Sequence, residues 1–102
     1  MTTHPVKLVT IICEALARAP LQRLLDEVGA QGSTLFTVEG DGAKGRRTAD
    51  IQEFANIQVE VIVCSLVAEK LLARLEEEFF PKFAMVAYET DIRVLRWRKF
   101  ES

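Results

Sequence analysis

Two kinds of hydrophobic spacing follow one another along the chain, and each predicts a different element of secondary structure. Residues 6–13 (VKLVTIIC) are apolar at both parities and rich in β-branched side chains, which is typical of a central strand covered on both faces. Apolar side chains then recur at helical spacing over residues 21–28, so we expect a helix that begins near Leu16 and ends at Gly29. Residues 33–39 (STLFTVE) predict a second strand.

The second half of the chain repeats this order with a clearer pattern. Residues 54–64 alternate between apolar and polar side chains, which predicts a strand with one buried face. Ser65 is a suitable N-cap for a second helix, and Pro81 ends its apolar stripe. Residues 82–89 and 92–100 predict a fourth and a fifth strand, joined by turn residues.

The order β-α-β-loop-β-α-β-β is typical of an α+β fold, the ferredoxin-like βαββαβ sandwich with an extra C-terminal strand. Both helices would then cover one face of an antiparallel sheet. The other face would carry a few apolar side chains among polar ones, namely Leu35 or Phe36, Ile62 and Tyr88. For a chain this small, burial of that face between subunits predicts a homo-oligomer.

Composition narrows the class of protein. The 102 residues form one domain (residues 1–102), and a net charge of -2 gives no electrostatic reason to bind nucleic acid or an anionic membrane. The apolar run at residues 6–13 is too short to span a bilayer and lacks the features of a signal peptide. Cys13 and Cys64 lie in apolar, strand-like runs, which favours buried thiols in a reducing, cytoplasmic location.

Residues that would support catalysis are few. The sequence pairs no nucleophile with a base and has no metal-ligand spacing, so we expect neither an enzyme nor a metal site. The only histidine, His4, is expected in an N-terminal tail. The acidic run at residues 76–78 is expected to be a solvated helix face.

A basic, glycine-rich loop at about residues 40–53 and the last predicted strand together indicate an anion site. The glycines and cations of the loop are Gly40, Gly42, Lys44, Gly45, Arg46 and Arg47. Glycines let backbone N–H groups turn towards an anion. Arg96 and Arg98 would share one strand face, about 7 Å apart. Either they hold a phosphate chain, or they pair with carboxylates such as Glu39 or Glu60.

Three segments carry a resemblance to a known family. Residues 27–42 (EVGAQGSTLFTVEGDG) resemble the PII signal-transduction motif, in which a helix ends in a Gly-x-x-Gly-x-Thr turn and a strand leads into a large glycine-bearing loop. Residues 57–63 (IQVEVIV) are similar to the strand that follows that loop. Residues 93–98 (RVLRWR) are similar to the closing strand with two phosphate-contacting arginines.

The resemblance implies a homotrimer with an adenine nucleotide in each subunit cleft. By position, Gly32 and Thr34 would contact the adenine, and Glu60 and Ile62 would form the wall behind it. Gly40 and Gly42 would begin a switching loop whose remaining members reach phosphate or a partner: Lys44, Gly45, Arg46 and Arg47. Arg96 and Arg98 would hold the phosphates from the neighbouring subunit.

Departures from the nitrogen-sensing members point to one branch of the family. The loop is short and has no tyrosine, Asn56 stands where those proteins carry a lysine, and the glycine-lysine segment after the second helix is absent. The chain is therefore more similar to PII-like carbon-side regulators, the SbtB-type and carboxysome-associated proteins. That similarity implies ADP or AMP as ligand, with ATP or cyclic AMP as further candidates. It also implies bicarbonate as a second ligand and no obligatory cofactor. The expected partner is a bicarbonate transporter or a carbon-fixation protein.

Other proteins with this topology remain alternatives. A CutA-type metal-binding trimer would need a cluster of His or Cys at a subunit boundary. An acylphosphatase would need a glycine-rich phosphate loop after the first strand, where the sequence has Arg18 but no glycine. A ligand-free oligomerisation module predicts that nucleotides change nothing.

Overall fold

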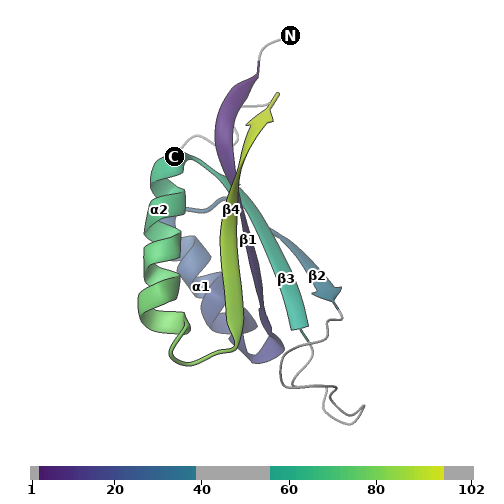
Figure 1. Ribbon diagram of the computed structural model, residues 1–102, viewed down its shortest axis with the longest axis vertical. Helices are drawn as coiled ribbons and strands as arrows, with labels where there is room; N and C mark the ends of the chain where they lie inside the picture. The colour runs from purple at the N-terminus through teal and green to yellow at the C-terminus, as the bar shows by residue number, and fades with distance from the viewer. Residues whose placement is uncertain (1–2, 39–55, 96–102) are drawn as a thin grey trace.

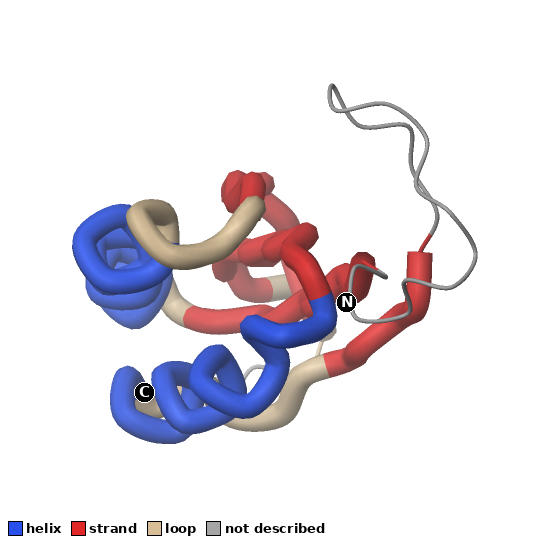
Figure 2. Tube along the Cα trace, turned by 90° about the horizontal axis from the view of Figure 1, so that it is seen from below, coloured by secondary structure: helices blue, strands red, loops and turns tan. Residues whose placement is uncertain are grey.

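The computed structural model describes residues 3–38 and 56–95. Its elements, in chain order, are β1 (His4–Glu14), a 3-10 turn (Ala15–Ala17), α1 (Arg18–Val28), β2 (Thr34–Val38), β3 (Asn56–Val63), α2 (Ser65–Arg74), a π-helical extension of α2 (Leu75–Phe79) and β4 (Met85–Val94). Neighbouring strands pair antiparallel in the order β2-β3-β1-β4. Both helices lie on the same side of this sheet (Figures 1 and 2). The predicted α+β ferredoxin-like sandwich is confirmed.

The core lies between the sheet and the helices. On β3 the alternation predicted from the sequence is confirmed, because Ile57, Val59, Val61 and Val63 are buried while the residues between them are half-buried. In β1, Val9 and Ile11 project to the same side and are fully buried. The helices contribute buried side chains at the expected spacing: Leu21, Leu24, Leu25, Val67, Ala68, Leu71, Leu75 and Phe79.

The C-terminal end of α1 agrees with the sequence prediction, and the N-terminal end of α2 differs from it. Gly29 ends α1 with φ +84°, and its N–H is directed to the Asp26 and Leu25 carbonyls, which confirms the predicted left-handed cap. The predicted N-cap of α2 is wrong by one residue. Cys64 keeps an extended backbone and its carbonyl accepts the Ala68 N–H at 3.0 Å, so Ser65 is the first helical residue.

The predicted break between two C-terminal strands is wrong. β4 is continuous from Met85 to Val94 and pairs with β1 along its whole length. Lys7 of β1 lies opposite Asp91 and makes ion pairs with Asp91 and, at 3.4 Å, with Glu89. Pairing with the long β1 therefore overrides the turn preference of Thr90 and Asp91.

Both ends of this strand pair also differ from the prediction. Residues 82–84 precede β4 in a turn in which the Phe79 carbonyl accepts the N–H groups of Lys82 and Phe83, each at 2.9 Å. His4 does not lie in a tail, because it begins β1 opposite Val94. The rest of the predicted fifth strand, beyond Leu95, lies outside the described residues.

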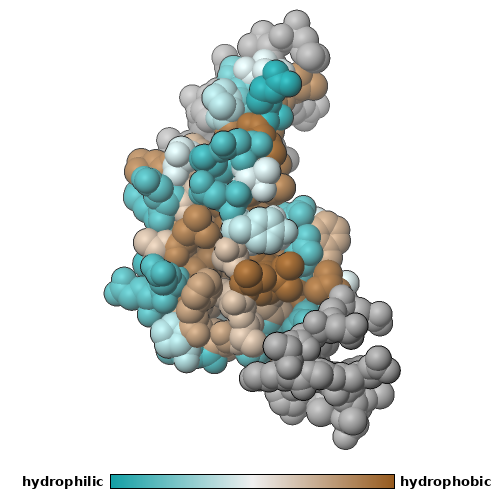
Figure 3. Space-filling view, viewed as in Figure 1, coloured by the Kyte–Doolittle hydropathy of each residue, from teal (hydrophilic) through white to brown (hydrophobic). Residues whose placement is uncertain are grey.

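No helix of residues 3–38 and 56–95 lies on the second face of the sheet (Figure 2). Residues paired across antiparallel strands share a face, so the register assigns Phe36, Ile62 and Tyr88 to this open face and Leu35 to the helix side. Phe36 is 43%, Tyr88 49% and Val86 51% exposed. The space-filling view shows apolar side chains gathered over the lower part of β4 and the strands beside it (Figure 3). Among the helices of residues 3–38 and 56–95, none is long and apolar enough to cross a membrane.

Candidate functional site

The turn between α1 and β2 brings backbone groups to the edge of the sheet. Gly29 and Gly32 both have positive φ, +84° and +78°, a conformation that costs a residue with a Cβ about 1–2 kcal/mol. A Cβ added to Gly32 would meet nothing within 4 Å. The backbone conformation therefore requires this glycine, and the space beside it is open.

Two predicted site residues lie directly opposite each other across the β2–β3 ladder. Thr34 is exposed at the start of β2, and it pairs in register with the half-buried Glu60 of β3. Gln58, two residues before Glu60 on the same face, donates a hydrogen bond from Nε2 to Glu60 Oε2 at 3.1 Å. This bond holds the carboxylate on the open face and leaves the Thr34 hydroxyl beside it accessible. Sequence reasoning missed Gln58, although its parity with Glu60 was visible.

The pair belongs to a row of polar side chains across all four strands. Thr10 of β1 lies opposite both Glu60 and Tyr88, so the row reads Thr34, Glu60, Thr10, Tyr88. Thr10 is only 2% exposed and is the one buried polar residue in the part of the chain that the structure describes. It was missed because it sits inside an apolar run, and only the register brings it beside Glu60.

The next rows on either side are more apolar. Ile62 is half-buried and pairs with Leu8 of β1, while Gln58 lies opposite Phe36 of β2. A planar heterocycle placed here would find apolar contacts from Ile62, and the Thr34 hydroxyl and Glu60 carboxylate as hydrogen-bonding groups. β2 is an edge strand, and it offers further main-chain donors and acceptors. The structure thus brings four predicted residues, Gly32, Thr34, Glu60 and Ile62, to one edge of the sheet.

The remaining predicted site residues lie outside the described residues. They are Gly40, Gly42, Lys44, Gly45, Arg46, Arg47, Arg96 and Arg98. Val38 and Asn56, the described residues on either side of residues 39–55, pair across β2 and β3. This pair is four residues along β2 from Thr34, about 13 Å by strand rise.

The described residues also bear on the two cysteines and on a metal site. Burial, together with the smaller effect of the nearby Glu14 carboxylate, raises the pKa of the Cys13 thiol to about 11, so the thiol stays protonated at neutral pH. No disulfide joins Cys13 to Cys64. Within residues 3–38 and 56–95, no three His, Cys, Asp or Glu side chains are arranged to hold a metal ion.

Comparison with known proteins adds two kinds of similarity. The family model of nitrogen regulatory protein P-II matches residues 6–99. A PII-like signalling protein from Thermus thermophilus is 40% identical, with a TM-score of 0.85, over 98% of this chain and 99% of its own.

A second relative has been solved with ligands. CPII, a nitrogen regulatory PII-like protein from Thiomonas intermedia K12, is 27% identical, with a TM-score of 0.87, over 99% of this chain and 98% of its own, in a structure bound to ADP, AMP and bicarbonate. Another CPII structure, bound to ADP, AMP and acetate, is 26% identical, with a TM-score of 0.85, over 100% of both chains.

Proposed function

Because the chain belongs to the nitrogen regulatory protein P-II family, we propose that it is a non-catalytic regulator that binds an adenine nucleotide at the β2–β3 edge. The observation that carries this proposal is the Thr34–Glu60 pair, with its carboxylate oriented by Gln58 beside the open turn at Gly32. These groups suit the hydrogen-bonding edge of adenine, and Ile62 suits its flat face. ADP and AMP are the expected ligands, since the relative CPII was solved with both.

The nucleotide phosphates would be held by residues beyond the described ones. Arg96 and Arg98 would contact them from a neighbouring subunit, and Lys44, Arg46 and Arg47 from the loop that begins at Gly40 and Gly42. Arginine pairs bind phosphate oxygens with bidentate, charge-assisted hydrogen bonds. Binding would select one conformation of the loop, and a partner would recognise that conformation.

A homotrimer follows from the same proposal, because the phosphate site needs a second subunit. The open face of the sheet supports assembly, since Val86 and Tyr88 are each about half exposed there. Val86→Asp should convert a trimer to smaller species in sedimentation velocity. Leu66→Asp, at a residue on α2 that is 58% exposed, is the control and should leave the assembly unchanged. Unchanged sedimentation of Val86→Asp would exclude this face as the interface.

The second ligand is proposed to be bicarbonate. CPII was solved with bicarbonate and, in another structure, with acetate, and both are small anions with a planar carboxyl group. A regulator that responds to adenine nucleotide and bicarbonate would act in inorganic carbon metabolism. Its partner would be a bicarbonate transporter or a carbon-fixation protein.

Titration calorimetry tests the proposal. The protein is titrated with ADP, AMP, ATP and cyclic AMP, each with and without bicarbonate, and with acetate as a second anion. We expect micromolar ADP or AMP binding that bicarbonate strengthens and that Arg96→Ala with Arg98→Ala abolishes. Arg18→Ala with Arg93→Ala removes the same charge elsewhere and is the matched control. No heat with any nucleotide, from a folded oligomer, would leave a ligand-free oligomerisation module instead.

A further inference from the structure

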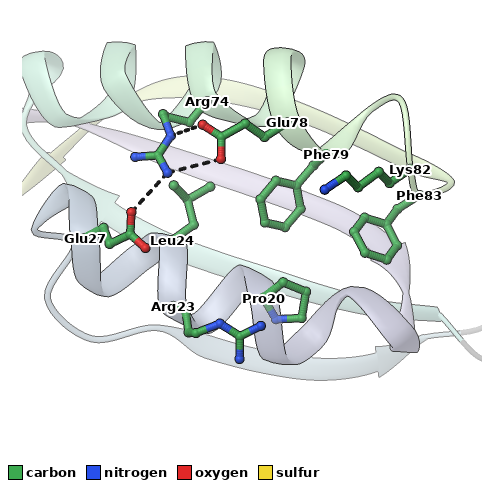
Figure 4. Close-up of a pocket in the computed structure, with 9 residues that line it drawn as sticks. All are labelled: Pro20, Arg23, Leu24, Glu27, Arg74, Glu78, Phe79, Lys82 and Phe83. Atoms are coloured by element: carbon green, nitrogen blue, oxygen red, sulfur yellow. Dashed lines mark hydrogen bonds and ion pairs between the residues drawn. The ribbon is translucent and has the colours of Figure 1, made fainter.

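A pocket lies between the two helices, away from the sheet edge that carries the proposed nucleotide site. It has a volume of about 230 Å³ and is lined by residues of α1, the C-terminal part of α2 with its π-helical extension, and the turn that follows. Figure 4 shows side chains from both helices directed into the space between them. All of the lining residues belong to the described part of the chain.

One wall of the pocket is a fixed ion-pair cluster. Arg74 of α2 donates to Glu78 through Nε, and through Nη2 to Glu78 Oε1 at 3.1 Å and to Glu27 Oε1 of α1 at 3.0 Å (Figure 4). These hydrogen bonds, to Glu78 first and Glu27 second, raise the pKa of Arg74 above its ordinary value. The bond to Arg74 also lowers the pKa of Glu78. The Arg74 charge is therefore already satisfied by protein carboxylates.

Two further cations line the pocket without such partners. Arg23 of α1 and Lys82 of the turn after Phe79 make no ion pair or hydrogen bond with any side chain of the described residues, although Lys82 acts on Glu78 through its charge. In Figure 4, Arg23 lies on the α1 side of the pocket and Lys82 on the opposite side. With three cations and two carboxylates in its lining, the pocket carries one net positive charge.

The remaining residues that line the pocket are apolar. Phe79 is 6% exposed and Phe83 is half-buried, and their ring centroids are 5.7 Å apart with a 40° tilt. Leu24 and Pro20 of α1 complete the lining opposite the rings (Figure 4). Five charged and four apolar residues thus line the pocket, and a lining of both kinds suits a small ligand that carries a charge on an apolar body.

We propose that this pocket binds a small organic monocarboxylate with an aromatic or branched apolar body. A cavity of about 150 Å³ takes a benzene molecule, so 230 Å³ has room for a ring that carries a short carboxylate arm. The carboxylate would pair with Lys82, which lies beside the two phenylalanine rings, while Arg23 adds positive charge from the α1 side; the body would contact the rings. One net positive charge suits a monoanion. A phosphate would bring more negative charge towards the Glu27 and Glu78 carboxylates, and it has no apolar part to contact the rings.

A titration followed by ¹H–¹⁵N NMR tests the site, with phenylacetate as the probe and the neutral phenylacetamide as its control. We expect saturable shifts of the amides of Arg23, Leu24, Phe79, Lys82 and Phe83 with phenylacetate. The amides of Thr34 and Glu60 should not move. Phenylacetamide should bind about fivefold more weakly or not at all, because it lacks the charge that the two cations recognise. Equal binding of the two probes, or shifts scattered over other surface cations, would overturn the proposal.

Variants separate the contribution of the two cations to binding from that of the phenylalanine rings. Lys82→Gln and Arg23→Gln should each weaken phenylacetate binding about two- to fivefold, as expected for exposed ion pairs. Phe83→Leu should weaken both probes and keep the fold, which the dispersion of the NMR spectrum would verify. Lys70→Gln removes an exposed charge of α2 outside the pocket and should change nothing. If Lys70→Gln weakens binding as much as Lys82→Gln, the attraction is non-specific and the site is excluded. ADP binding should persist in all four variants, so failure here is distinguishable from failure of the proposed nucleotide site.

Discussion

The two faces of the sheet differ in what their side chains can do, although they alternate residue by residue along the same strands. On the helix side of β3, Ile57, Val59, Val61 and Val63 are at most 5% exposed and belong to the core. On the open side, Gln58 and Glu60 form a hydrogen-bonded pair beside the exposed Thr34. The helix side therefore supplies stability, and the open side carries the groups of the proposed nucleotide site and subunit interface.

The largest expected effect is on the free energy of unfolding, and it comes from truncating a side chain on the helix side of the sheet and not one on the open side. Ile11 is fully buried on the helix side of β1, and Ile12, its neighbour, is half-buried on the open side. Ile11→Ala should lower the free energy of unfolding by about 2–5 kcal/mol, because it leaves a cavity in a packed core. Ile12→Ala should cost the isolated subunit less and weaken subunit association instead. Denaturant unfolding and sedimentation measure the two effects. Equal losses of subunit stability would contradict the division between the faces.

The next effect is on the stability of the turn at Gly32, which leads into β2. Gly32→Ala should destabilise the fold by about 1–2 kcal/mol, because alanine resists a φ of +78° even where its Cβ meets nothing. Gly32→Asn should cost less, since asparagine adopts this conformation more readily. Thermal unfolding compares them. An alanine variant as stable as the asparagine variant would show that backbone conformation is not what requires the glycine.

A smaller effect, on affinity and not on stability, distinguishes the two sides of β2. Thr34→Ala should weaken ADP binding about five- to tenfold, the contribution expected of one hydrogen bond. Thr37→Ala, on the same strand but on the helix side opposite Ile57, is the matched control and should bind ADP normally. Calorimetry measures both. Normal binding by Thr34→Ala would remove this hydroxyl from the proposed site.

The smallest effect is a pH dependence in the helical layer. The hydrogen bond to Arg74 lowers the pKa of Glu78 below its ordinary value of 4.5, so the folded state favours the ionised form. The stabilisation is present above pH 4.5 and is lost as the pH falls through the lowered pKa. The stability advantage of the wild type over Glu78→Gln should therefore be greatest near neutral pH and shrink in acid. Glu76→Gln, on an exposed residue of the same segment, is the control. A difference independent of pH would show that the ion pair does not cause it.

Features encoded in local spacing could be predicted from the sequence. The alternation in β3 and the cap at Gly29 depend on residues close together in the chain, and both are confirmed. The continuity of β4 could not be predicted, because it depends on pairing of Asp91 with Lys7, 84 positions away.

The same reason limited the prediction of the site. The resemblance to PII proteins predicted Thr34 and Glu60, and the register brings them together. Thr10 and the Arg74–Glu27 bond across the helices were missed, because they become visible only when distant segments are brought side by side.

The most direct test of the central claim is a ¹H–¹⁵N NMR titration of the assigned protein with ADP. We predict saturable shifts that centre on the amides of Gly32, Thr34, Glu60 and Ile62, at the β2–β3 edge. Shifts confined to other parts of the molecule, or no shifts at saturating ADP, would contradict an adenine site at this edge.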